Sequence, residues 1–173
     1  NMDIKKFLQN RPLSWSQLSC FEYSPDQWYR RYILGEKQRE SKEMIFGKVI
    51  AHSIEIGKPL VPFTIIRGKP IKGKNVEYQF KVMFSGIPLL GFADTFDHVT
   101  FRRLGEFKTS KNGWDQTKVD GHGQIDMYLL MNFITNKVKP EDVDCFLEYV
   151  QTRETGDFKI RLVRPVKIYH FKT

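Results

Sequence analysis

Cysteine is scarce in this chain, which has two cysteines among 173 residues. Cys20 and Cys145 are far apart in the sequence and form no C-x-x-C pair. Closely spaced cysteine pairs are typical of structural zinc sites, and even sets of cysteines are typical of disulfide frameworks. The sequence predicts neither, and we expect both residues to be reduced, partly buried thiols.

Long hydrophobic runs are also missing. No apolar segment approaches the roughly 20 residues that a membrane-spanning helix needs, and the opening stretch NMDIKKFLQN lacks the apolar region of a secretory signal. We therefore expect a soluble, cytoplasmic protein without a membrane partner. The aromatic content of 14% is that of a folded protein with a real core. The length suits one domain, which we expect over residues 2–173.

Acidic residues are outnumbered, with 20 Asp and Glu against 28 Lys and Arg, so the formal net charge is +8. Such an imbalance favours polyanionic partners, because binding them releases counterions. Nucleic acid is the first expectation and an acidic membrane surface the second. Charge alone also allows a basic protein with no such partner.

The periodicity of apolar residues predicts a mixed α/β domain with one central sheet. Serine and proline signals indicate two short helices over 12–35, and helical spacing predicts a third over 41–57. A period of two then predicts an antiparallel meander, followed by one helix and two more strands. The expected strands cover 76–84, 89–97, 100–108, 143–152 and 158–171, and the expected helix covers 115–138 with Asp115 as its cap.

The segment LGEFKTS contains the first candidate chemistry. Residues i and i+2 of a strand share a face, so Glu106 and Lys108 should point the same way and Phe107 the opposite way. The midpoint between Asp94 and Glu106 is Thr100, in the expected turn, so a hairpin with that register places these two carboxylates opposite or diagonal to each other. Two facing carboxylates repel unless positive charge lies between them, and a divalent cation together with Lys108 would supply it.

The alternative interpretation is a solvated sheet face, because E-x-K alternation is common on half-exposed strands. Two features favour a site. Asp94 ends the apolar stretch GFAD, and Glu106 ends a similar run in its own strand.

Five stretches together resemble the PD-(D/E)XK nuclease superfamily, in its RecB-like branch of helicase-associated and stand-alone phage exonucleases. SWSQLSCFEYSPDQWYRRYI is similar to the N-terminal S-x-S-x-L-x-x-F-x-x-C-P entry, and FGKVIAHSIE to the G-x-x-x-x-H helix. GFAD resembles motif II, GEFKTS the E/D-x-K motif and GQIDMY the Q-x-x-x-Y motif, with Trp114 in the aromatic position before it. They occur in the expected order and cover nearly the whole chain.

The resemblance implies a restriction-endonuclease-like core and a Mg²⁺- or Mn²⁺-dependent deoxyribonuclease. The implied metal ligands are His52, Asp94, Glu106 and the backbone carbonyl of Phe107. Lys108 would orient or deprotonate the attacking water and stabilise the developing charge. Gln124 and Tyr128, one helical turn apart, would support the lysine and touch the DNA backbone. Oxygen-rich ligands with an imidazole suit Mg²⁺ or Mn²⁺.

The remaining candidates are basic residues that could bind DNA and histidines that lie outside the motifs. We expect the basic stretch from Arg67 to Lys74 to contact DNA phosphates, although such a stretch is often only solvated. The candidate DNA-binding residues are Lys69, Lys72, Lys74 and Lys111. His98, His122 and His170 match no motif and are expected to be structural or on the surface.

Two departures from the family pattern limit the expectation. Ser24 stands where the iron-sulphur subgroup has its first cysteine, so we expect no iron-sulphur cluster. The segment between His52 and Glu77 is short, which leaves exonuclease or endonuclease action open. An exonuclease of recombination, repair or phage genome processing, acting in a bacterial or infected host cell, is the leading hypothesis. A non-catalytic nucleic-acid-binding module of the same fold within a larger complex is the alternative.

Overall fold

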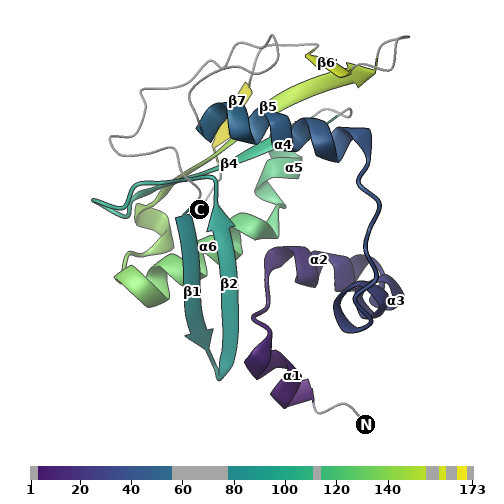
Figure 1. The fold of residues 1–173 in the computed structure, drawn as a ribbon. Coiled ribbons are helices and arrows are strands. Elements are labelled where there is room, and N and C mark those ends of the chain that lie inside the picture. Colours follow the sequence, from purple (N-terminus) through teal and green to yellow (C-terminus); the bar gives the residue numbers. More distant parts are fainter. Residues whose placement is uncertain (1–3, 56–77, 111–113, 155–159, 163–166, 171–173) are drawn as a thin grey trace.

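The computed structural model describes residues 4–55, 78–110, 114–154, 160–162 and 167–170 (Figure 1). The predicted loop over 58–75, with Lys69, Lys72 and Lys74, lies outside the described residues, and so does Lys111. The helices are α1 (Ile4–Asn10), α2 (Trp15–Tyr23), α3 (Pro25–Trp28), α4 (Lys42–Glu55), α5 (Gln116–Asp120) and α6 (Gly123–Asn136). The strands are β1 (Tyr78–Phe84), β2 (Ile87–Ala93), β3 (Thr95–Phe96), β4 (Arg103–Ser110), β5 (Asp144–Glu154), β6 (Ile160–Leu162) and β7 (Lys167–His170). The mixed α/β class is thus confirmed.

The N-terminal helices begin where the sequence signals indicate. The Ser14 side chain accepts a hydrogen bond from the amide of Gln17 and caps α2, and Ser24 caps α3, in which Pro25 takes a first-turn position. A π-helical turn η1 (Tyr29–Ile33) continues α3, and Gly35 follows with a positive φ of 74°. Helix α1 had not been predicted. Helix α4 agrees with the third predicted helix and lies beside the larger sheet (Figure 1).

The prediction of one central sheet is wrong, because the strands form two sheets. Strands β1 and β2 make an antiparallel hairpin, while β3, β4, β5 and β6 form a second, mixed sheet in which β7 also pairs with β5. The free edge of β2 is partly taken by Leu13, whose amide donates to the carbonyl of Pro88 and whose carbonyl accepts from the amide of Leu90. The two residues of β3, which follow β2, pair with β4.

The single predicted helix over 115–138 is divided into α5 and α6. Asp115 caps α5 as expected, by accepting from the amide of Lys118. The chain then turns at Gly121 and His122, where glycine lowers helix propensity, and α6 begins at Gly123. The last predicted strand, over 158–171, is likewise present as two short strands, β6 and β7.

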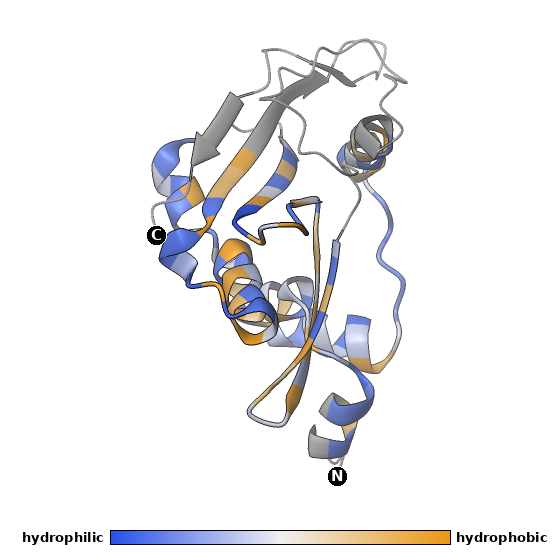
Figure 2. Ribbon diagram, turned by 90° about the vertical axis from the view of Figure 1, so that its left-hand side faces the viewer, coloured by the Kyte–Doolittle hydropathy of each residue, from blue (hydrophilic) through white to orange (hydrophobic). Residues whose placement is uncertain are grey.

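The main core lies between α6 and the strands. Figure 2 shows hydrophobic residues in α6 and in the strands around it. Helix α6 packs so closely on β2 that a Cβ atom added at Gly91 would come within 2.4 Å of Met131 and 2.7 Å of Tyr128. An added Cβ at Gly105 would similarly lie 2.3 Å from the ring of Phe146. The glycines that precede Asp94 and Glu106 therefore permit the close packing that positions these carboxylates.

Candidate functional site

Strand β4 presents Glu106 and Lys108 on the same face, as predicted. The Lys108 Nζ atom lies 2.7 Å from Glu106 Oε1. Glu106 is only 4% exposed, and the side chain of Lys108 is 25% exposed. The pair is therefore not a solvated strand surface, which was the alternative interpretation of the E-x-K pattern.

Asp94 joins this pair at the bend between β2 and β3. Thr95 is opposite Gly105 and Phe96 is opposite Leu104, which is the register centred on Thr100 that the sequence predicts. The next position outward places Asp94 opposite Glu106. The Asp94 Oδ2 atom accepts a hydrogen bond of 2.7 Å from the amide of Phe107. The Asp94 side chain is thus bonded to β4 at the residue that follows Glu106.

Helix α6 supplies the other side of the cluster. The Gln124 Oε1 atom accepts from Lys108 Nζ at 2.8 Å, and Gln124 Nε2 donates to Glu106 Oε1 at 2.8 Å. Gln124 Nε2 also donates to the Tyr128 hydroxyl at 2.6 Å, and that hydroxyl donates to the carbonyl of Phe92 at 2.6 Å. The structure therefore brings Gln124 into contact with the lysine, whereas the functional roles of Gln124 and Tyr128 and their contact with DNA stay predictions.

The electrostatics of this cluster are dominated by the burial of Glu106. Burial and then the negative charge of Asp94 raise the pKa of Glu106 from 4.5 to about 8, against the opposing effects of Lys108 and Gln124. Glu106 Oε2 is buried and has no hydrogen-bond partner among the described residues. A buried carboxylate oxygen without a partner is costly, and a cation bound there would remove that cost.

These observations fit a divalent metal at the two carboxylates. The unpartnered Glu106 oxygen and the nearby Asp94 are hard anionic oxygen donors of the kind that Mg²⁺ and Mn²⁺ prefer. Within the described part of the chain, however, no three His, Cys, Asp or Glu side chains are grouped so that they could hold a metal. His52 lies exposed on α4, which approaches β4 closely at Gly47 and Thr109. The roles of His52 and of the Phe107 carbonyl as ligands stay predictions.

His122 is a member of the cluster that the sequence interpretation missed. Its ring contacts the indoles of Trp15 and Trp114, with ring centroids 5.9 Å and 5.2 Å away. Burial, followed by the positive charge of Lys108, lowers the pKa of His122 to about 4, so the imidazole is neutral near pH 7. The only sequence signal for this residue is its place between two glycines, two positions before Gln124.

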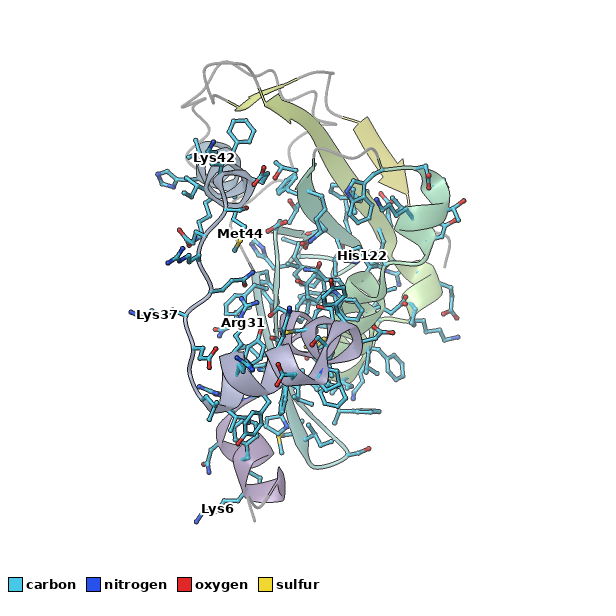
Figure 3. The ribbon with its side chains drawn as sticks, turned by 90° about the vertical axis from the view of Figure 1, so that its right-hand side faces the viewer. Lys6, Arg31, Lys37, Lys42, Met44 and His122 are labelled. Atoms are coloured by element: carbon cyan, nitrogen blue, oxygen red, sulfur yellow. The ribbon has the colours of Figure 1, made fainter. Side chains whose placement is uncertain are left out.

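The protein also has a pocket that does not include the residues of the carboxylate cluster. It has a volume of about 230 Å³ and is lined by Cys20, Gln27, Arg30, Arg31, Glu36, Lys37 and Gln38. Its charges are of both signs, and Arg30 is already paired with Asp26 at 2.9 Å. In Figure 3, Lys37 extends away from the body of the protein. We therefore place the candidate site at the carboxylates, where the burial and the pKa shift occur, and not at this pocket.

Comparison with known proteins does not assign the chain to a family. No protein-family model matches the chain, and the search of curated proteins found no match. None of the described helices combines the length and the apolar character needed to cross a membrane. The argument for function therefore depends on the cluster itself.

The raised pKa of Glu106 leads to a prediction about stability. A carboxyl group whose pKa is higher in the folded protein binds more protons there than in the unfolded chain, so the metal-free protein should lose stability as the pH rises from 4.5 towards 8. The loss should be at most about 5 kcal/mol for a shift of this size. It can be measured as the free energy of unfolding in EDTA across that pH range.

A Glu106→Gln variant provides the comparison. Glutamine keeps an oxygen that accepts from Lys108 and Gln124 but cannot ionise, so its stability should vary less with pH and should exceed that of the parent near pH 9. Glu141→Gln, at an exposed position, is the matched control and should follow the parent. Parallel pH profiles for the parent and Glu106→Gln would show that Glu106 does not titrate in this way.

Proposed function

We propose that this chain is a metal-dependent deoxyribonuclease of the PD-(D/E)XK type, with a restriction-endonuclease-like core, that hydrolyses phosphodiester bonds. The observation that carries the proposal is the cluster at the bend between β2 and β3. There Asp94 and a buried Glu106 converge, Glu106 keeps one unpartnered oxygen, and Lys108 is held beside it by Gln124. The excess of positive charge, +8 over the whole chain, suits a polyanionic substrate.

Each residue of the cluster has a role in this proposal. Asp94 and Glu106 would hold Mg²⁺ or Mn²⁺, which when bound polarises the phosphodiester and lowers the pKa of water. Lys108 supplies a fixed positive charge for the transition state, in a partly buried setting where such charges act strongly. Gln124 orients the ammonium group, since its amide accepts from Lys108 and donates to Glu106. Tyr128 anchors Gln124 to the backbone of β2.

The same proposal includes a role for the protein in DNA processing. We favour an exonuclease that acts in recombination, repair or phage genome processing, in the cytoplasm of a bacterial or infected cell. The alternative function, a non-catalytic nucleic-acid-binding module, is favoured by one observation. The described residues do not assemble a third His, Cys, Asp or Glu ligand beside Asp94 and Glu106.

A cleavage assay separates these functions. End-labelled linear DNA, circular DNA and RNA of the same sequence are incubated with the protein in Mg²⁺, in Mn²⁺ and in EDTA. We expect cleavage of linear DNA that requires added metal, because two carboxylates hold such ions loosely. Activity that survives exhaustive EDTA treatment would contradict the metal requirement. DNA binding without cleavage under every metal condition would instead support the binding module.

A further inference from the structure

The ring of His122 contacts the rings of two tryptophans, Trp15 and Trp114, in tilted arrangements. Trp15 is the first residue of α2, Trp114 precedes α5, and His122 connects α5 to α6. The imidazole is inclined by 40° to the ring of Trp15 and by 36° to that of Trp114. Lys118 Nζ lies 5.3 Å from the centre of the Trp114 ring. Figure 3 labels His122 at this connection.

The backbone beside His122 has little stiffness of its own. Gly121 precedes it and Gly123 follows it, and glycine leaves the chain more conformational freedom than any other residue. The indole of Trp15 occupies the space beside Gly123, because an added Cβ atom there would lie 2.6 Å from the nearest indole carbon. The side chains that limit the motion of this turn are therefore those of His122 and of Trp15, which packs against Gly123.

His122 also contacts the helix turn that carries Gln124. Its Nδ1 atom accepts from the amide of Gln124 at 3.4 Å and so caps the first turn of α6. That distance is long for a hydrogen bond, so the ring contacts should hold the turn more firmly than the cap does. Gln124 is in turn bonded to Lys108, Glu106 and Tyr128.

We propose that His122 is a positioning residue of the candidate site. Its ring, through its contacts with Trp15 and Trp114, fixes the first turn of α6 and therefore the Gln124 amide that keeps Lys108 against Glu106. The catalytic consequence of this role rests on the proposed nuclease function. The structural consequence, the position of the Gln124 amide, does not.

Substitutions at position 122 distinguish the effect of the aromatic ring from the effect of the capping nitrogen. His122→Phe keeps an aromatic ring and lacks the capping nitrogen, whereas His122→Asn keeps a capping atom and lacks the ring. We expect His122→Asn and His122→Ala to lower kcat for DNA cleavage by about 10- to 100-fold, the range for small misplacements of catalytic groups. KM should change little, because the basic surface is intact, and His122→Phe should retain most of the parent activity.

A second measurement follows Gln124 without depending on cleavage. In the ¹H–¹⁵N spectrum, the side-chain amide of Gln124 is identified by its loss in Gln124→Glu. Because this amide donates to Glu106 and Tyr128 in the parent, its resonances should shift or broaden in His122→Asn and should remain near their parent positions in His122→Phe. Should His122→Ala fail to fold, the Asn and Phe variants alone decide the question.

The control is Phe21→Ala, which removes a ring from a different aromatic pair, the edge-to-face contact with Trp28 at 5.5 Å. It should leave both kcat and the Gln124 resonances unchanged. The proposal is overturned if His122→Asn leaves the Gln124 resonances unchanged, or if His122→Phe perturbs them as strongly as His122→Asn does. If the parent protein cleaves no nucleic acid, the nuclease function fails, and the resonances still test the positioning role.

Discussion

Asp94→Asn is expected to abolish Mn²⁺ binding at the candidate site and to lower DNA cleavage by at least about 1,000-fold. Asparagine has nearly the same shape and keeps an oxygen that can accept from the Phe107 amide, so the bend between β2 and β3 should persist. What it removes is one of the two anionic donors. Calorimetric Mn²⁺ titration, run beside cleavage and DNA-binding measurements, tests both consequences, and DNA binding should be retained.

A carboxylate three residues away provides the control for Asp94. Asp97 accepts from the amides of Val99 and Thr100 in the turn before β4. Asp97→Asn removes the same charge and should leave Mn²⁺ affinity and cleavage close to the parent values. If Asp94→Asn binds Mn²⁺ as tightly as the parent does, Asp94 is not a metal ligand and the proposed metal-dependent nuclease function is contradicted.

Lys108→Met is expected to have the second-largest effect on DNA cleavage. Unlike Asp94→Asn, it should lower cleavage without weakening Mn²⁺ binding. Methionine fills a similar space but removes a positive charge that lies 2.7 Å from Glu106. Because that charge competes with the metal for the Glu106 carboxylate, Mn²⁺ affinity should be kept or should rise. Cleavage should fall by about 100- to 1,000-fold if the ammonium stabilises transition-state charge. Single-turnover cleavage at saturating Mn²⁺ measures this loss without a contribution from metal affinity.

The control for Lys108 is an exposed lysine on the hairpin. Lys81→Met on β1 removes the same charge from an exposed position and should leave single-turnover cleavage within about two-fold of the parent rate, because surface charges outside a site contribute little. Cleavage by Lys108→Met at the parent rate would mean that the lysine only neutralises Glu106. Reduced cleavage together with lost Mn²⁺ binding would indicate instead that Lys108 maintains the structure of the metal site.

Local patterns predicted the central part of the candidate site. The two-residue period of β4 places Glu106 and Lys108 on one face, which is a property of any strand. A hairpin register centred on Thr100 places Asp94 opposite Glu106, and the observed pairing has that register. The helical spacing of Gln124 and Tyr128 likewise explains why their side chains meet. These predictions depend only on residues that are near one another in the chain.

The errors of the sequence interpretation involve contacts between distant segments. The predicted meander is present as two sheets, and Leu13, far from β2 in the sequence, pairs with part of the edge of that strand. The predicted helix over 115–138 divides at Gly121 and His122, where Trp15 from α2 packs against the turn. A periodicity that is read along one segment contains no information about a partner from another segment.

Local backbone geometry is enough to predict which residues share a strand face, a hairpin register or a helix turn, so these could be read from the sequence. The 4% exposure of Glu106, the rise of its pKa to about 8 and the contacts of His122 with two tryptophans could not. Burial, desolvation and ring contacts depend on which segments pack together. That packing is set by the whole core, in which α6 meets β2 across a glycine, and not by any single stretch of the chain.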